Sequence, residues 1–282
     1  MTHDSSEGKP RSRPFSSGLA WLSQSLVLMR MQSGRLLLIA VFMQVILGLT
    51  QLPLIGFFIV LSVPGLSAGI LEAFDVTRRG GIPGINLLFK PLLSGTHTAR
   101  LFLMGLVVFV VGVASISLLL SGSEDLVSPE LLTRIEQGDV EAVSQLDPDA
   151  LKKMIMAFLV GVAISGTLSY FTIPLMWFRG RKLGTALAEG LRALLMNWKP
   201  FLALMLGLFV LLIPVAFVTG ILLGLSATGG VVSILVMGVI MILLLGYQML
   251  IFGTQYCAFR DIFGDEEPSM PQPRDDDTQL VA

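Results

Sequence analysis

Residues 121–149 read SGSEDLVSPELLTRIEQGDVEAVSQLDPD, and this stretch decides how the rest of the chain is interpreted. It is the only long internal segment that is not apolar, and it holds eight carboxylates against one cation, Arg134. Such a density of charge requires water, because burying unpaired charge is strongly unfavourable. Three apolar runs precede the segment and three follow it, each close to the roughly 20 residues that a helix needs to cross a bilayer.

The overall composition agrees with a chain that lies largely in lipid. Hydrophobic residues make up 54% of the sequence, charged residues make up 14%, and the mean hydropathy is +0.80. These values are too apolar for a soluble protein of this length. The net charge of −1 offers no basic domain for nucleic acid. A single cysteine and two scattered histidines exclude a disulfide and a cysteine or histidine metal cluster, and we expect no cofactor.

We therefore predict an all-α, polytopic membrane protein with six transmembrane helices. The predicted spans are about 36–52, 53–74, 101–120, 154–178, 201–225 and 231–253. Pro53 suits the first turn of the second helix, so the first two spans form a hairpin with a tight turn. The six-span domain covers residues 17–263 and carries an extracytoplasmic acidic loop at 121–150. The polar ends, residues 1–16 and 264–282, are predicted to be disordered.

Three segments on the same side of the membrane are predicted to be cytoplasmic interfacial helices. The first runs from Gly18 to Met31, the second lies within residues 75–100, and the third ends at Trp198. Apolar residues in the first and third recur at three- and four-residue steps, which is typical of a helix with one apolar face. The apolar positions are Leu19, Leu22, Leu26 and Met29 in the first segment, and Leu187, Leu191, Leu194 and Leu195 in the third. This layout suggests a unit of surface helix, span, turn and span that occurs three times.

The distribution of lysine and arginine predicts the orientation, because cytoplasmic connections are enriched in both. The segment before the first span has five, the connection from the second to the third span has four, and that from the fourth to the fifth has five. The first hairpin turn and the SATGG turn at residues 226–230 have none. Both termini are therefore expected in the cytoplasm. Trp21, Trp177 and Trp198 are expected near that interface.

Neutral polar residues within the spans give the first candidate site. The spans carry no ionisable residue near their middle, which argues against a proton-coupled or cation-coupled transporter. The candidate intramembrane pocket consists of Gln44, Ser67, Thr167 and Gln248. These side chains either line a pocket for a solute or form hydrogen bonds between helices. Each of the two glutamines is a lone amide in an apolar span and needs a partner.

Three prolines are candidate helix kinks. Pro64, Pro174 and Pro214 lie in the second, fourth and fifth spans, and each removes one backbone hydrogen bond. Bent or broken helices bind substrate in some transporters, whereas many static spans also tolerate proline. The sequence leaves both interpretations open.

A charged group follows the second span. Glu72, Asp75, Arg78 and Arg79 either form a cytoplasmic mouth for a ligand or are ordinary interfacial charges that set the topology. The basic connections can also contact anionic lipid headgroups.

No sequence pattern for catalysis is present. The chain has no G-x-S-x-G, H-E-x-x-H, paired-cysteine or Walker sequence. Cys257 has no histidine neighbour in sequence and is expected to be a packing or interfacial residue. The acidic loop lacks the D-x-[DN]-x-[DN]-G pattern of a calcium loop. We therefore expect no enzymatic activity and predict no catalytic, cofactor-binding or metal-binding residues.

Two stretches resemble a known family. Residues 63–91 read VPGLSAGILEAFDVTRRGGIPGINLLFKP, and residues 256–263 read YCAFRDIF. They resemble the segment after the second span, and the end of the last span, in a family of uncharacterised bacterial six-span inner-membrane proteins. The layout of residues 18–263 is also similar to the membrane domain attached to some glycerophosphodiester phosphodiesterases. The resemblance implies a location in the bacterial inner (plasma) membrane and a six-span fold, but it implies no activity, because the family brings no known catalytic residues.

The sequence thus favours an integral inner-membrane protein that acts without catalysis, through lipid or protein contacts. The alternative is a permease or channel for a small uncharged or amphipathic solute. The expected partners are membrane lipids, with a protein partner or a second copy of the chain as a further possibility, and nucleic acid is not expected.

Overall fold

The computed structural model describes residues 10–121, Arg134, 147–226 and 230–264. Within these ranges the chain is helical and contains no strand. In this described part of the chain, six helices are long and apolar enough to cross a membrane, which confirms the predicted all-α fold of a multi-pass membrane protein. The predictions of disorder for residues 1–9 and 265–282, and most of the acidic loop, lie outside the described residues.

The helices follow one another in three similar groups. They are α1 (Ser17–Met31), α2 (Ser33–Gly48), η1 (Leu49–Gln51), α3 (Pro53–Arg78), α4 (Asn86–Phe89), η2 (Lys90–Leu93), α5 (Thr96–Leu120), α8 (Pro148–Phe178), α9 (Leu183–Met196), α10 (Trp198–Ser226) and α11 (Gly230–Phe263). Each group has a short helical segment followed by two long apolar helices. Pro53 occupies the first turn of α3, as its missing N–H donor favours.

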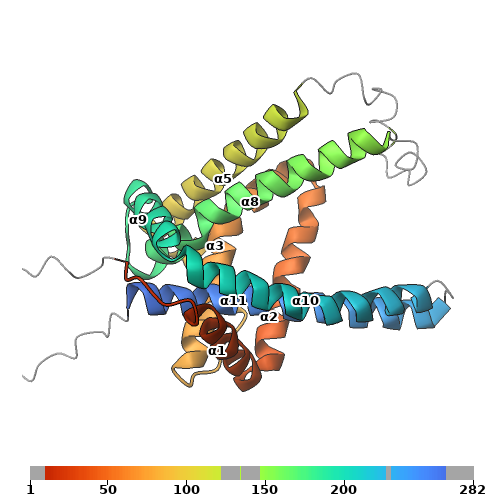
Figure 1. Ribbon diagram of the computed structural model, residues 1–282, viewed down its shortest axis with the longest axis horizontal. Helices are drawn as coiled ribbons and strands as arrows, with labels where there is room; N and C mark the ends of the chain where they lie inside the picture. The colour runs from red at the N-terminus through yellow and green to blue at the C-terminus, as the bar shows by residue number, and fades with distance from the viewer. Residues whose placement is uncertain (1–9, 122–133, 135–146, 227–229, 265–282) are drawn as a thin grey trace, which may run out of the picture.

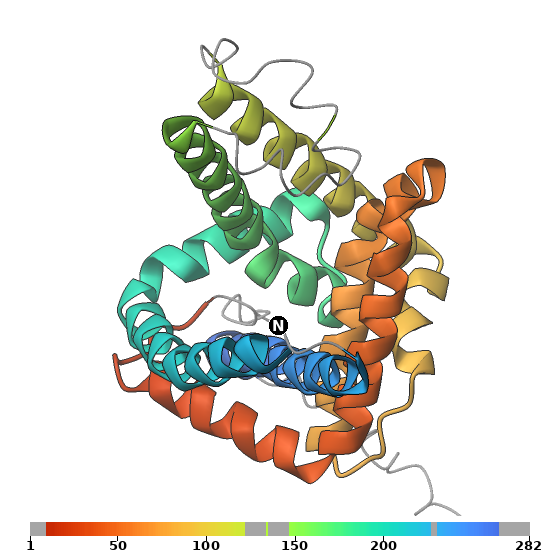
Figure 2. The same ribbon diagram turned by 90° about the vertical axis from the view of Figure 1, so that its right-hand side faces the viewer.

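The six long helices form three hairpins, α2–α3, α5–α8 and α10–α11. The hairpins diverge from one end of the molecule, so their far ends are separated (Figures 1 and 2). Large apolar side chains at these far ends are exposed, for example Leu54 (81%) and Leu118 (76%). Such surfaces are unfavourable in water but match the hydrocarbon of a bilayer.

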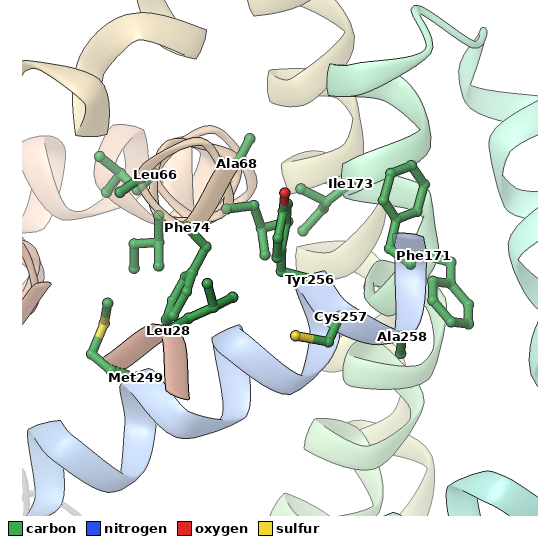
Figure 3. Close-up of a cluster of buried hydrophobic side chains, with 14 of the residues drawn as sticks. Leu28, Leu66, Ala68, Phe74, Phe171, Ile173, Met249, Tyr256, Cys257 and Ala258 are labelled. Atoms are coloured by element: carbon green, nitrogen blue, oxygen red, sulfur yellow. The ribbon is translucent and has the colours of Figure 1, made fainter. Parts of the chain in front are cut away.

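The hairpins meet in a buried region that we call the hub. It consists of the C-terminal halves of α3, α8 and α11 together with α1. Its largest fully buried side chains include Trp21, Phe74, Phe171 and Tyr256. Figure 3 shows side chains from α1, α3, α8 and α11 converging there, with Tyr256 next to Phe74.

Helix α11 continues about ten residues beyond the predicted end of the sixth span at residue 253. Residues 254–263 complete the helix, and nearly all of them are buried in the hub. Arg260 and Asp261 lower the local hydropathy of this stretch, but Asp261 pairs with Arg13 and Arg260 pairs with Asp75. The polarity that suggested an exit from the membrane therefore belongs to a helix that goes on inside the protein.

Helix α1 packs closely on α10 and α11. A side chain at Gly18 would collide with the backbone carbonyl of Pro200, and one at Gly253 would collide with Ser25 of α1. Ser25 also donates a hydrogen bond of 3.1 Å to the carbonyl of Leu250. The buried face of α1 therefore combines the small residues Gly18 and Ser25 with Trp21, Leu22 and Leu28.

The leucine faces predicted for α1 and α9 are only partly buried. Leu19 of α1 is 50% exposed, and Leu195 of α9 is 75% exposed. Helix α9 instead packs on α8 through Ala186, Gly190 and Ala193. Small residues thus make the contacts of α9 with the protein, and the exposed leucines of both helices are available to lipid.

Residues 10–16, at the N-terminus of the described chain, lie against the end of α11. The backbone N–H of Arg11 donates to the carbonyl of Ile262 at 2.9 Å. The side chain of Asn197 accepts from the N–H of Arg13 at 2.8 Å and donates to the carbonyl of Arg11 at 3.1 Å. The two described ends of the chain therefore meet at the hub.

Candidate functional site

Asp75, from the predicted cytoplasmic mouth, is the centre of a buried polar network. Its side chain lies at the end of α3 and the residue is only 5% exposed. The hydroxyl of Tyr256 donates to Oδ1 at 2.6 Å, and Nη1 of Arg260 donates to the same oxygen at 3.0 Å. Oδ2 pairs with Nη2 of Arg79 at 2.8 Å. Both carboxylate oxygens are therefore engaged, as a buried charge requires.

The helical spacing explains why α3 contributes both the buried carboxylate and two arginines that lie near it. Asp75, Arg78 and Arg79 stand at i, i+3 and i+4 and so share one face of the helix. Arg78 lies farther from the carboxylate, with Nη2 3.9 Å from Oδ1 of Asp75, and its Nε donates to the hydroxyl of Tyr256 at 3.0 Å. Asp75 is thus already engaged by Arg79 and Arg260, and Arg78 adds positive charge beside it.

Glu72, the fourth residue of the predicted mouth, belongs to a separate cluster. It forms an ion pair with Lys90 of η2, and its Oε2 accepts a hydrogen bond of 2.9 Å from the indole of Trp177. The ring of His97 lies edge-on to Trp177, with the two centroids 5.7 Å apart. These contacts join α3, η2, α5 and α8. Glu72 therefore connects helices through contacts that are separate from the Asp75 network.

A cavity of about 620 Å³ opens beside the Asp75 network, between α1 and the end of α11. Four arginines line it, and the carboxylate among its lining residues is Asp261. The full lining is Arg11, Arg13, Ser23, Gln24, Val27, Leu28, Arg78, Tyr256, Cys257, Arg260, Asp261 and Gly264. We call this space the arginine cavity.

Each of the two carboxylates near the arginine cavity already forms an ion pair with an arginine. Asp261 pairs with Arg13 at 2.9 Å and accepts from the indole N–H of Trp21 at 2.9 Å. Asp75 pairs with Arg79 and Arg260, as described above. The guanidinium groups of Arg11 and Arg78 therefore add positive charge to the cavity beyond what these two carboxylates balance. Paired nitrogen donors of this kind suit the oxygens of a phosphate or carboxylate.

Two of the four residues of the candidate intramembrane pocket contact each other. Nε2 of Gln44 in α2 donates to Oε1 of Gln248 in α11 at 2.8 Å, so the two amides partner each other. Ser67 is buried in α3, whereas Thr167 is on α8 and its hydroxyl donates to the carbonyl of Ala163 at 2.7 Å. The geometry favours interhelical and intrahelical hydrogen bonding for three of the four residues.

The three candidate kink prolines lie within continuous helices. Pro64 and Pro174 are buried near the hub, and Pro214 is exposed on α10. Pro174 cannot donate to the carbonyl of Tyr170, four residues earlier. That carbonyl accepts a hydrogen bond of 2.6 Å from Nε2 of Gln255 in α11 instead. The missing backbone bond of α8 is thus replaced by a tie to another helix, which favours a static role for Pro174.

The sequence predicts the half of the site that lies on α3 but not the half that the N-terminal segment and the end of α11 contribute. Arg11 and Arg13 lie in a stretch that its polar composition marked as disordered. Arg260 and Asp261 lie just beyond the predicted last span. The sequence pattern that could have indicated them is a charged pair between aromatic residues. Among the described residues, no three His, Cys, Asp or Glu side chains group together in a way that could hold a metal ion.

Searches with the sequence and the structure find no matching family model, curated protein or solved structure. The resemblance of residues 63–91 and 256–263 to a bacterial six-span family therefore stays a prediction.

Proposed function

We propose that this chain is a non-enzymatic integral membrane protein that binds the headgroup of an anionic phospholipid in the arginine cavity. The observation that carries the proposal is the convergence of Arg11, Arg13, Arg78 and Arg260 on one cavity at the ends of two apolar helices. A phosphate group offers oxygens that accept from several guanidinium nitrogens at once. The exposed side chain of Val27 at the cavity gives it an apolar wall as well.

The proposal includes a location in the bacterial inner membrane with both termini in the cytoplasm. Its support is the gathering of basic residues at the hub, where the N-terminal segment, the end of α3 and the α8–α9 connection meet. The outward leucines of α9 also support a helix that lies at the interface. Cysteines introduced at Gln137 and Arg181 test the orientation by labelling in intact cells. Labelling of both positions from the same compartment would refute it.

A permease for a small uncharged or amphipathic solute is less well supported. Gln44 and Gln248, the two amides best placed to bind a solute between spans, are bonded to each other. The diverging hairpins expose apolar side chains, and such a surface suits lipid better than a polar solute. Contact with a second copy or another protein stays a separate hypothesis.

Native mass spectrometry tests headgroup binding directly. The purified protein, in a neutral detergent, is titrated with phosphatidylglycerol and with phosphatidylcholine. The wild-type protein should prefer phosphatidylglycerol, and the double variant Arg11→Gln/Arg78→Gln should lose that preference. Each charge near the phosphate is worth about 1 kcal/mol, so the double variant should weaken binding at least tenfold.

Arg192→Gln is the control for loss of a positive charge outside the arginine cavity. Arg192 is an exposed residue of α9 that does not line the arginine cavity, and its substitution removes one positive charge. Equal affinity of the wild-type and double-variant proteins for phosphatidylglycerol would remove the proposed function.

A further inference from the structure

A second hollow lies on the other side of α1, between α1 and α10. Its volume is about 500 Å³, and Ser23 is the one residue with a polar side chain in its lining. The lining is Phe15, Leu19, Leu22, Ser23, Leu26, Ala203, Leu206, Gly207, Val210 and Leu211. We call this hollow the α1–α10 groove.

The groove adjoins the arginine cavity across the outer face of α1. Ser23 lines both spaces, and the exposed residues Gln24 and Val27 continue that face towards the arginines. The hydroxyl of Ser23 donates to the carbonyl of Ala20 at 2.9 Å, so its polar group is already satisfied within the helix. A hydrocarbon chain can therefore cross Ser23 without burying an unmet donor.

The groove is also accessible from the region that lipid would occupy. Leu206 and Val210 of α10 are 53% and 62% exposed, although they lie on one of the six apolar helices. Gly207 keeps α10 close to α1 at the floor of the groove, because a side chain there would meet Leu22 at 2.9 Å. The walls are thus apolar and face the bilayer.

We propose that the arginine cavity and the α1–α10 groove are two parts of one site for a single anionic phospholipid. The phosphate lies among the arginines, and one acyl chain passes over Ser23 into the groove. This inference rests on the proposed function for the headgroup and adds the chain. A water-soluble phosphate compound would satisfy the arginines but leave the groove empty, whereas a phospholipid fills both.

The experiment separates the two parts with variants of the intact protein. Leu206→Trp narrows the groove at an exposed position, and Val210→Trp provides a second, independent obstruction. Met205→Trp is the matched control, because Met205 is 66% exposed on the same helix but does not line the groove. The probes are dioleoyl phosphatidylglycerol, its dihexanoyl counterpart and the chain-free headgroup glycerophosphoglycerol, which is measured by competition in native mass spectrometry.

The two groove variants should bind dioleoyl phosphatidylglycerol at least about tenfold more weakly than Met205→Trp does, which corresponds to ~1.4 kcal/mol. Competition by glycerophosphoglycerol should be unchanged, and the advantage of the long chains over the short chains should shrink. Affinities for the long-chain lipid equal to that of Met205→Trp in both groove variants would overturn the two-part site while leaving headgroup binding intact. Insensitivity to Arg11→Gln/Arg78→Gln, or no binding by the wild-type protein, would overturn the proposed function together with this inference.

Discussion

Removing the carboxylate of Asp75 should destabilise the hub more than removing either of the exposed arginines beside it. Asp75 is 5% exposed and accepts from Tyr256, Arg260 and Arg79. Asp75→Ala would leave the hydroxyl of Tyr256 and the mostly buried guanidinium of Arg260 without this acceptor. Breaking a buried ion pair by removing one partner costs about 3–5 kcal/mol, because the other charge stays buried.

The same reasoning gives a small effect for Arg79→Ala. The side chain of Arg79 is 59% exposed, and an exposed ion pair contributes about 0–1 kcal/mol. The double variant Asp75→Leu/Arg260→Met should recover much of the stability lost in Asp75→Ala, since replacing both members of a buried pair by apolar groups is often neutral. Asp149→Ala is the surface control, because Asp149 is exposed at the start of α8.

Thermal unfolding in detergent, followed by tryptophan fluorescence, provides the assay. Trp21 and Trp177 both contact the polar networks of the hub and report on its integrity. The expected loss for Asp75→Ala corresponds to a fall in Tm of roughly 6–20 °C at the 2–4 °C per kcal/mol typical of chains of this size. A Tm for Asp75→Ala within 2 °C of that for Arg79→Ala would refute the idea that burial makes this carboxylate a structural centre.

Three further predictions concern contacts between helices. Gln44→Leu alone should lower the free energy of unfolding by about 1 kcal/mol, because it leaves Gln248 unpaired. The Gln44→Leu/Gln248→Leu double variant should recover this loss. Denaturant titrations that show an equal loss in both variants would contradict the pairing. Gln255→Leu should destabilise the wild-type protein but have little effect in a Pro174→Ala background, where the backbone bond is restored, and a double-mutant cycle with no coupling energy would reject this replacement. Gly253→Leu should displace α1 and cost about 1–3 kcal/mol because its side chain would overlap Ser25 of α1, so an unchanged Tm would show that α1 does not pack there.

The positions of the long helices along the chain were predictable because hydropathy is a local property of the sequence. Each span shows as an apolar run in its own window of sequence, and Pro53 marks the start of α3 without reference to the rest of the chain. The end of α11 was harder to predict. Arg260 and Asp261 are polar in sequence, and only their pairing with residues from distant segments allows the helix to stay buried beyond residue 253.

Half of the candidate site was predictable for a similar reason. Asp75, Arg78 and Arg79 follow one another on α3, and their charge stands out after an apolar run. Tyr256 and Arg260 complete the network from about 180 residues away, and no local pattern connects them to Asp75.

The two glutamines illustrate the same limit. Each amide within an apolar span indicated that a partner was required, but the sequence did not show that Gln44 and Gln248 would partner each other. Arg11 could not be predicted as a site residue because the stretch around it is polar. Its position depends on hydrogen bonds from its backbone N–H to the carbonyl of Ile262 and from the side chain of Asn197 to its carbonyl, and both partners are distant in sequence.

Photocrosslinking from position 24 in living cells tests the central claim most directly. Gln24 is an exposed residue of α1 that lines the arginine cavity, so a benzophenone side chain placed there would contact the bound headgroup. Mass spectrometry of the adducts should find anionic phospholipids enriched over their share of the surrounding membrane, and Arg11→Gln/Arg78→Gln should abolish the enrichment. Adducts whose headgroups match the bulk membrane composition, with or without the two arginines, would contradict an anionic lipid site at the hub.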